Sequence, residues 1–273
     1  MRAPEPRLLG VAGCPIGHSR SPVMHAAALR ELGLAWRYFK LPLPPELFAE
    51  TVRALPAVGY VGLNVTVPHK EAALEIADSR TPTAGAVGAA NTLTFTEQGI
   101  EADNTDAPGL IAALDEPPGG RRALVLGAGG AGRAAAWALR EAGADVSVWN
   151  RTPERGRDLA AELGIAYVER AAGAPDVVVN ATSVGLDPDI SEEQALEALG
   201  LRVGEPPATL VDLVYGERET ALTAWARRGG SAVVDGLEVL VHQGALSLER
   251  WTGRGPPLAA MRAAAAHGGL DIR

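Results

Sequence analysis

The chain has 273 residues, and its 33 acidic and 25 basic side chains give a formal net charge of −8. This balance argues against a nucleic-acid partner, which would need a basic surface, and no apolar run approaches the roughly 20 residues that span a bilayer. A single cysteine, Cys14, leaves no internal disulfide, and the N-terminal segment lacks the apolar stretch of a secretory signal, so we expect a cytoplasmic protein.

The first part of the chain alternates apolar runs with helical stretches, which is typical of a parallel α/β fold. We expect strands at residues 8–13, 36–43 and 62–67, helices at 21–32, 46–55 and from about 70, and a hairpin of strands 92–96 and 100–104. These boundaries follow from apolar periodicity and from turn residues such as Gly33 and Gly99.

A second unit is expected to begin near residue 107. Its predicted helices are 107–114, 132–142 and 153–163, and its predicted strands are 122–126, 145–149, 177–180, 209–214 and 232–234. From about His242 the chain is again helical and is expected to return to the first unit. The prediction is therefore two α/β domains with a cleft between them: residues 1–106 completed by 242–273, with a mainly parallel sheet, and a Rossmann-like domain at 107–241.

A glycine-rich turn lies between the expected strand at 122–126 and the helix that follows. The pattern G-x-G-x-x-G places Gly127 at a tight turn, Gly129 where a pyrophosphate can approach the backbone, and Gly132 where helix and strand pack closely. The helix N-terminus then offers free N–H groups to phosphates. Glycines also serve ordinary strand-to-helix turns, but the flanking elements favour nucleotide binding.

The next strand ends in Asn150-Arg151-Thr152, and Arg155 follows one turn later. An NAD site usually carries Asp or Glu at this point to hold the ribose 2′-hydroxyl. Two guanidinium groups without a carboxylate suit a 2′-phosphate instead, so the segment favours NADP. The alternative is that both arginines are solvated surface charges.

Near the N-terminus, Ser21 followed by Pro22 predicts a helix start, with Ser21 as the capping residue and Pro22 at the first helical position. With Ser19 two residues earlier, this turn could hold a small anion. Taken alone, a capping turn without a ligand explains the same residues. Cys14 nearby is interpreted as a small packed residue rather than a nucleophile.

Lys70 follows the third expected strand, and it is one of only two lysines in the chain, Lys40 being the other. A lysine at the carboxyl edge of an open α/β sheet can act as a general acid–base. Asp106, before the helix that leads into the second unit, could pair with it and fix its charge. The plain alternatives are a surface lysine and a helix cap. The five histidines show no metal-ligand spacing, so no metal site is assigned.

In chain order, these motifs resemble those of the shikimate dehydrogenase family over residues 13–253. The segments that carry the resemblance are PIGHSRSP at 15–22, NVTVPHK at 64–70, ANT at 90–92, NTD at 104–106, GAGGAGRA at 127–134, NRT at 150–152, NATSVG at 180–185, DLVY at 212–215 and LVHQGA at 240–245. The resemblance implies NADPH-linked, reversible reduction of 3-dehydroshikimate to shikimate in aromatic amino-acid biosynthesis. Substrate would bind to the first domain and NADP to the second.

The resemblance also implies roles for individual residues. Lys70 and Asp106 would be the catalytic, proton-transferring pair. Ser19, Ser21 and Tyr215 would hold the substrate carboxylate, while Thr66, Asn91 and Gln243 would join the pair around the ring hydroxyls and the reacting oxygen. The residues expected to contact NADP are Gly127, Ala128, Gly129, Gly130, Ala131, Gly132, Asn150, Arg151, Thr152, Arg155, Thr182, Ser183 and Gly236.

The chain departs from the family pattern at three places. Ala26 stands where many members have Asn, Glu238-Val239 where Gly-Met is common, and Gly216-Glu217 where Asn-Pro is usual. A quinate/shikimate dehydrogenase with relaxed substrate or cofactor choice stays open, as does a non-catalytic nucleotide-binding regulator of the same fold. A methylenetetrahydrofolate dehydrogenase is less compatible, because Ser19-Arg20-Ser21 does not suit a pterin. The oligomeric state also stays open, with a homodimer as one option.

Overall fold

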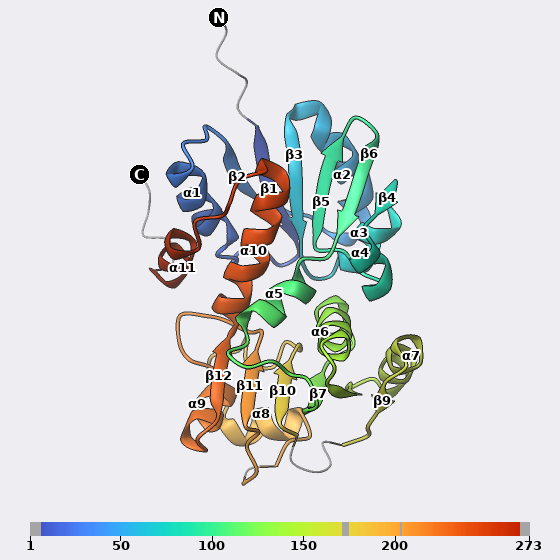
Figure 1. Ribbon diagram of the computed structural model, residues 1–273, viewed down its shortest axis with the longest axis vertical. Coiled ribbons are helices and arrows are strands. Elements are labelled where there is room, and N and C mark those ends of the chain that lie inside the picture. Colours follow the sequence, from blue (N-terminus) through green and yellow to red (C-terminus); the bar gives the residue numbers. More distant parts are fainter. Residues whose placement is uncertain (1–6, 171–174, 203, 268–273) are drawn as a thin grey trace, which may run out of the picture. The chain divides into compact units, whose positions relative to one another are not determined.

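The computed structural model describes residues 7–170, 175–202 and 204–267 (Figure 1). Contacts divide the chain into two compact units. The first comprises the chain up to Thr105 together with the chain from Leu240 onward, and the second is Asp106–Val239. Each unit is built on one six-stranded sheet. The predicted α/β class is confirmed.

The sheet of the first unit has the strand order β2-β1-β3-β5-β6-β4. Its strands are β1 (Leu8–Gly13), β2 (Arg37–Pro42), β3 (Tyr60–Val65), β4 (Ser79–Arg80), β5 (Thr92–Thr96) and β6 (Gly99–Asp103). Only β5 runs against its neighbours among these strands, pairing antiparallel with β3 and β6, while the other pairs are parallel. The sheet is therefore mainly parallel, as predicted.

Helices cover both faces of this sheet. They are α1 (Ser21–Glu31), α2 (Pro45–Ala54), α3 (Lys70–Glu75), α4 (Pro82–Val87), α10 (Gly236–Thr252) and α11 (Leu258–His267), with a 3₁₀ turn η1 (Leu55–Val58) after α2. Leu63 of β3 packs with Phe48 of α2 on one face. The neighbouring Gly62 faces the other side, where a Cβ would lie 2.2 Å from the indole of Trp251, so α10 packs directly on the backbone there.

The sheet of the second unit has the order β12-β11-β10-β7-β8-β9, and every strand pair in it is parallel. The strands are β7 (Arg122–Leu126), β8 (Asp145–Trp149), β9 (Ala166–Tyr167), β10 (Val177–Asn180), β11 (Thr209–Asp212) and β12 (Ala232–Asp235). Numbered within the unit, this is the 3-2-1-4-5-6 order of the dinucleotide-binding fold, read from the opposite edge. The predicted Rossmann-like topology is confirmed.

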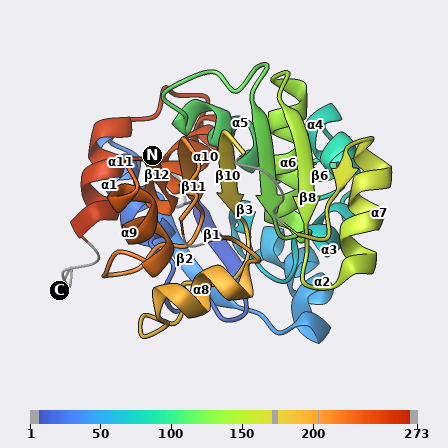
Figure 2. The ribbon, with the colours of Figure 1, turned by 90° about the horizontal axis from the view of Figure 1, so that it is seen from below.

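Five helices sandwich this second sheet (Figure 2). They are α5 (Asp106–Ala113), α6 (Gly130–Glu141), α7 (Pro153–Leu163), α8 (Glu192–Ala198) and α9 (Ala221–Arg228). On one face Val148 packs with Leu139 of α6 and Leu159 of α7. On the other, Leu126 packs with side chains of α8 and α9. Alternating apolar strand residues thus serve two separate cores, as expected for a sheet buried on both sides.

Some predicted boundaries are wrong. The third strand spans 60–65 rather than 62–67, because the chain turns after Val65: the His69 N–H donates to the Thr66 carbonyl, and Pro68 has no N–H for a sheet. The helix expected from His242 begins at Gly236. Helices α4, α8 and α9 were not predicted. In the described part of the chain, no helix has the length and apolar content needed to cross a membrane.

Candidate functional site

The predicted substrate-binding side chains of the first unit gather at one edge of its sheet. Ser19 lies in the connection from β1 to α1, Ser21 begins α1, Thr66 follows β3, and Lys70 begins α3. Asn91 directly precedes β5. Since β1 and β3 are parallel and β5 is antiparallel to β3, the ends of the first two and the start of the third share an edge.

Backbone hydrogen bonds tie these connections together. The Cys14 N–H donates to the Val67 carbonyl (3.0 Å), joining the β1 and β3 connections. The Ala90 N–H donates to the Lys70 carbonyl (2.8 Å), which holds the start of α3 beside the residue preceding Asn91. The position of the Lys70 backbone is therefore fixed by two neighbouring segments, and its side chain starts from a defined point.

The turn before α1 differs from its prediction. Arg20, not Ser21, occupies the cap position, and Ser21 is the first residue of the helix. Ser19 Oγ instead accepts a hydrogen bond from the Ser21 N–H (3.3 Å). Ser19 therefore supplies the side-chain oxygen that satisfies a helix N–H at this point. Both serines are buried.

A positive charge lies beside this turn. The Lys40 ammonium donates to the Gly17 carbonyl, two residues before Ser19. Burial lowers the pKa of His18, and the Lys40 charge lowers it further. The lowered pKa favours the neutral form of His18, so Lys40 rather than His18 adds positive charge near the two serines.

Asn91 and Gln243 are brought into direct contact. Asn91 Nδ2 donates to Gln243 Oε1 at 3.0 Å, although 152 residues separate them in the sequence. Asn91 is 2% exposed and Gln243 7% exposed. Two predicted substrate ligands, one directly before β5 and one on α10, thus form one buried amide pair.

The glycine-rich turn connects β7 to α6, and its three glycines have three different surroundings. Gly127 has φ +108, a conformation that L side chains rarely adopt. A Cβ on Gly132 would lie 2.0 Å from the Gly127 carbonyl oxygen, so any side chain there would force the turn and the helix apart. At Gly129, apart from the glycine and its two chain neighbours, no atom of the described residues lies within 4 Å of the place that a Cβ would take. The open space at Gly129, at the start of a 12-residue helix, fits a phosphate approaching the backbone.

Asn150, which directly follows β8, stabilises this turn through hydrogen bonds. Its Oδ1 accepts from the Ala128 N–H (3.0 Å), and its Nδ2 donates to the Thr152 carbonyl (2.8 Å). The side chains that follow, Arg151, Thr152 and Arg155, are exposed. Asn150 therefore shapes the turn, while the two arginines lie outside the core, where they can meet a charged group.

The remaining predicted cofactor residues lie in connections organised by a buried carboxylate, Asp212. Its oxygens accept from Asn180 Nδ2 (2.9 Å), the Val214 N–H (3.2 Å) and Thr220 Oγ1 (2.6 Å). Burial raises the pKa of the Asp212 carboxyl, although these hydrogen bonds oppose the rise. Asp212 thus links the segment carrying Thr182 to the one that continues to Tyr215.

The Thr182 hydroxyl is already engaged within its own turn. It donates to Asn180 Oδ1 (2.7 Å) and accepts from the Val184 N–H (3.1 Å). A Cβ on Gly127 would lie 2.9 Å from the Ala181 carbonyl oxygen, so this segment borders the glycine-rich turn. Gly236, the last of the predicted cofactor residues, is similarly close to the backbone: its Cβ would lie 2.6 Å from the Leu213 carbonyl oxygen.

Replacing Gly132 by Ala should destabilise the second unit, because the new carbon would meet the Gly127 carbonyl oxygen. Replacing Gly129 by Ala should leave the melting temperature nearly unchanged, since its carbon enters open space, but should weaken NADP binding at least about tenfold by blocking the approach of the pyrophosphate. Calorimetric Tm and NADP titration of both variants check this. Equal NADP affinity in Gly129→Ala and the parent would remove the turn from the cofactor site.

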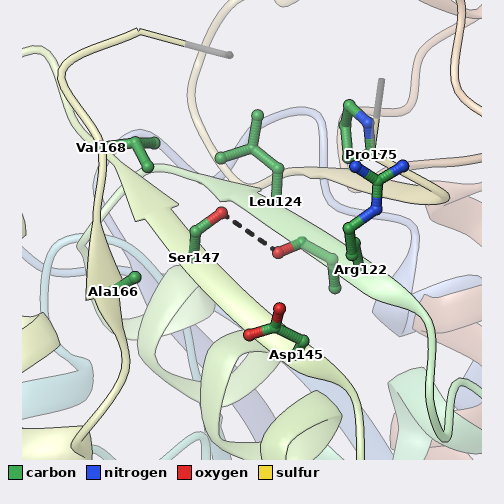
Figure 3. Close-up of a pocket in the computed structure, with 8 residues that line it drawn as sticks. Arg122, Leu124, Asp145, Ser147, Ala166, Val168 and Pro175 are labelled. Atoms are coloured by element: carbon green, nitrogen blue, oxygen red, sulfur yellow. Dashed lines mark hydrogen bonds between the residues drawn. The ribbon is translucent and has the colours of Figure 1, made fainter. Parts of the chain in front are cut away.

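A hollow of about 140 Å³ lies elsewhere on the second unit (Figure 3). It is lined by Arg122, Ala123, Leu124, Asp145, Ser147, Ala166, Val168 and Pro175. Arg122 and Asp145 are the first residues of β7 and β8, so the hollow lies toward the amino ends of these strands. Ligands of open α/β sheets bind at the carboxyl ends. The hollow shares no residue with the predicted sites.

Several buried polar residues around the amide pair were not predicted. Ser247 contacts Asn64, Thr92 and Thr105, and Tyr38 Oη donates to Asn64 Oδ1 (2.8 Å). One signal was available: Ser247 follows Gln243 by four residues, so the two share a helix face. Among the residues that the structure describes, no cluster of His, Cys, Asp or Glu could hold a metal ion.

Comparison with known proteins covers most of the chain. Residues 11–93 match the shikimate dehydrogenase substrate binding domain, residues 115–215 match shikimate/quinate 5-dehydrogenase, and residues 236–266 match the shikimate 5′-dehydrogenase C-terminal domain. The NADP(+) shikimate dehydrogenase of Methanothermobacter thermautotrophicus is 40% identical, over 92% of this chain and 93% of its own. That of Anaeromyxobacter sp. is 45% identical, over 95% of each.

A solved structure agrees with these relatives. Shikimate 5-dehydrogenase from Thermus thermophilus, in complex with NADP(H) and shikimate, is 41% identical and superimposes with a TM-score of 0.86. The match covers 96% of this chain and 99% of that one. The similarity therefore includes both units rather than a single shared domain.

Proposed function

The chain belongs to the shikimate dehydrogenase family, and from this premise we propose that it catalyses the reversible, NADPH-dependent reduction of 3-dehydroshikimate to shikimate in aromatic amino-acid biosynthesis. The observation that carries the proposal is a similarity at 41% identity, covering 99% of the other chain, to an enzyme solved with both NADP(H) and shikimate. It is an oxidoreductase with NADP as its cofactor.

We propose that the substrate carboxylate is held by Ser19, Ser21 and Tyr215. The two serines lie at the N-terminus of an 11-residue helix, whose dipole favours an anion. The nearby Lys40 charge, which lowers the pKa of His18, makes this region still more favourable to a carboxylate. Thr66, Asn91 and Gln243 would then contact the ring oxygens.

The proton-transfer roles are assigned to Lys70 and Asp106. A carbonyl that becomes an alcohol needs a cation to stabilise the developing negative charge on its oxygen and a proton to complete the hydroxyl. A lysine ammonium can do both, whereas a guanidinium keeps its proton at working pH. Asp106 would fix the position of this ammonium and keep it charged. In the oxidative direction the neutral amine of Lys70 would accept the hydroxyl proton and become the ammonium again.

The second unit would hold the cofactor, which when bound supplies the hydride to the substrate carbon. The open space at Gly129 and the N-terminus of α6 would receive the pyrophosphate. Arg151 and Arg155, with Thr152, would receive the 2′-phosphate, and Asn150 would keep the turn in shape through its bond to the Ala128 N–H. Thr182, Ser183 and Gly236 would lie further along the cofactor. A cytoplasmic location stays a prediction, and so does the option of a homodimer.

The test is the initial rate of NADP reduction with shikimate, run beside quinate and beside NAD. We expect a high kcat/KM with shikimate and NADP and at least about a hundredfold lower value with NAD, because two charge-assisted arginine–phosphate contacts would be lost. Comparable rates with quinate or NAD would indicate an enzyme of broad specificity. NADP binding without turnover of either acid would indicate a non-catalytic protein of the same fold.

A further inference from the structure

A cluster of buried hydroxyl and amide groups lies beneath the Asn91–Gln243 pair, and Ser247 of α10 is at its centre. Ser247 is fully buried and contacts three side chains: Asn64 Nδ2 at 2.9 Å, Thr92 Oγ1 at 2.8 Å and Thr105 Oγ1 at 3.1 Å. A fourth contact joins its Oγ to the Gln243 carbonyl oxygen at 3.1 Å. This one hydroxyl therefore links α10 to β3, β5 and the segment after β6.

The chemistry of these groups sets the direction of the bonds. A carbonyl oxygen can only accept, so the Ser247 proton goes to the Gln243 carbonyl. The lone pairs of Ser247 Oγ are then available to the Asn64 amide, which can only donate through Nδ2, and to the Thr92 hydroxyl. In this arrangement all three bonding positions of the serine hydroxyl are used.

The orientation of both active amides follows from this cluster. Asn91 Oδ1 accepts from the Thr105 backbone N–H (2.7 Å), so its Nδ2 must face Thr105 Oγ1 and Gln243 Oε1, each 3.0 Å away. Gln243 Oε1 is thereby an acceptor, and its Nε2 donates to the Leu240 carbonyl (2.8 Å). The second hydrogen on Gln243 Nε2 has no acceptor among the described residues, so this amide can offer a substrate one donor.

We propose that Ser247 is a positioning residue of this enzyme: together with Thr92 and Thr105 it fixes the amide planes of Asn91 and Gln243, so that Gln243 presents a single N–H donor to an oxygen of the substrate. The proposal rests on the proposed function for the identity of that substrate. It assigns Ser247 no contact with the substrate itself.

Removing the Ser247 hydroxyl would leave buried polar atoms without partners. In Ser247→Ala, the Asn64 amide and the Thr92 hydroxyl would each lose an acceptor, and buried groups left unpaired drive their neighbours to rearrange. Because Thr92 Oγ1 also lies 3.1 Å from Asn91 Oδ1 and 3.1 Å from Thr105 Oγ1, the rearrangement would reach the amide pair directly. Alanine is the best helix former, so α10 itself should be retained.

The experiment compares Ser247→Ala with Thr252→Val in steady-state kinetics at a temperature well below both melting points. Thr252 is a matched control, because it also lies on α10 and its hydroxyl donates to a helix carbonyl four residues earlier, that of Leu248 (2.8 Å), away from the cluster. We expect Ser247→Ala to raise the KM for shikimate about three- to tenfold and to lower kcat, with the KM for NADP unchanged. Thr252→Val should leave all three constants unchanged.

A second pair of variants keeps the test independent of helix stability. Thr92→Val removes the hydroxyl at nearly constant shape and should raise the shikimate KM in the same way. Thr92→Ser keeps the hydroxyl, so its shikimate KM should equal that of the parent. A shikimate KM in Ser247→Ala equal to that of Thr252→Val, with only the melting temperature lowered, would overturn the proposal and leave Ser247 as a packing residue.

A failure of the positioning role of Ser247 can be distinguished from a failure of the proposed enzymatic function. If the parent enzyme does not oxidise shikimate, the proposed function is wrong. The positioning role is then decided by ¹⁵N spectra of the ligand-free protein. The side-chain amide signals of Asn91 and Gln243 should shift and exchange faster with solvent in Ser247→Ala than in Thr252→Val. Unchanged amide signals would contradict the positioning role whatever the activity.

Discussion

Replacing Lys70 by Ala is expected to lower kcat for shikimate oxidation by about 10²- to 10⁴-fold, the range typical for removal of a general acid–base. The KM for shikimate should change far less, since several other groups are assigned to the substrate. The fold should tolerate the change. Lys70 is the first residue of α3, where a cation is unfavourable for the helix dipole, and the bond from the Ala90 N–H goes to its backbone carbonyl.

Lys70→Arg separates proton transfer from charge. The guanidinium keeps the positive charge but does not release its proton at working pH. We expect a kcat nearly as low as that of Lys70→Ala, with a KM close to that of the parent. Recovery of most of the activity in Lys70→Arg would mean that the charge alone is needed, and near-normal turnover in Lys70→Ala would exclude Lys70 from the chemistry. Steady-state kinetics with a Tm for each variant decides between these results.

The second large effect is a loss of stability at acid pH, and it is expected from His25, a fully buried residue of α1. Its ring stacks on Tyr38 with centroids 4.3 Å apart and lies 5.9 Å from the ring of Trp251. Neither ring nitrogen has a hydrogen-bond partner among the described residues. Burial lowers the pKa of His25 to about 3, because an imidazolium in this apolar position would lose its hydration without gaining a partner.

Because of this lowered pKa, the free energy of unfolding should depend on pH. Above pH 6.5 the imidazole is neutral in both the folded and the unfolded chain. As the pH falls below 6.5, the unfolded chain takes up a proton that the folded chain does not bind until about pH 3. The free energy of unfolding should therefore fall by up to about 1.4 kcal/mol per pH unit across this window from His25 alone, on the order of 5 kcal/mol in total.

Urea unfolding at pH 8, 7, 6, 5 and 4 of the parent and of His25→Phe tests this expectation. Phenylalanine keeps a planar ring against Tyr38 but does not titrate. The difference between the two unfolding free energies should be constant above pH 7 and should shift steadily in favour of His25→Phe below pH 6. The carboxylates contribute equally to both proteins, so the difference isolates the histidine. Parallel curves down to pH 4 would show that His25 gains its proton equally in both states.

Local signals in the sequence were sufficient for much of the second unit, but not for all of its helices. The segment from β7 through α6 to β8 combines short apolar strands, a glycine-rich turn and a helical pattern, and β7, β8, α7 and β10 have the predicted bounds. Helix α8 was missed although Ser191 and Gln194 form a capping box, a signal readable from the sequence. Its neighbouring loops, rich in Asp, Pro and Gly, obscured the apolar period.

The candidate site was harder to predict, because its supporting contacts join distant segments. The bond between Asn64 and Ser247 spans 183 residues, and nothing in either local sequence specifies the other. Ser21 was assigned as a cap from a strong local pattern, yet the helix starts one residue earlier and Ser19 supplies the oxygen. Asn150 was predicted to contact the cofactor, and only its partners, the Ala128 N–H and the Thr152 carbonyl, reveal that it shapes the turn.

The first unit can complete its fold only after the whole second unit has been synthesised, because its last helices come at the end of the chain. Trp251 and the rest of α10 cover one face of the first sheet, and α11 contacts α1, yet these helices follow the whole second unit in the sequence. During translation the second unit can therefore complete its core first. Until α10 and α11 have been made, one apolar face of the first sheet stays uncovered. Slow synthesis, or a stop near residue 240, should therefore expose this face to chaperones and proteases.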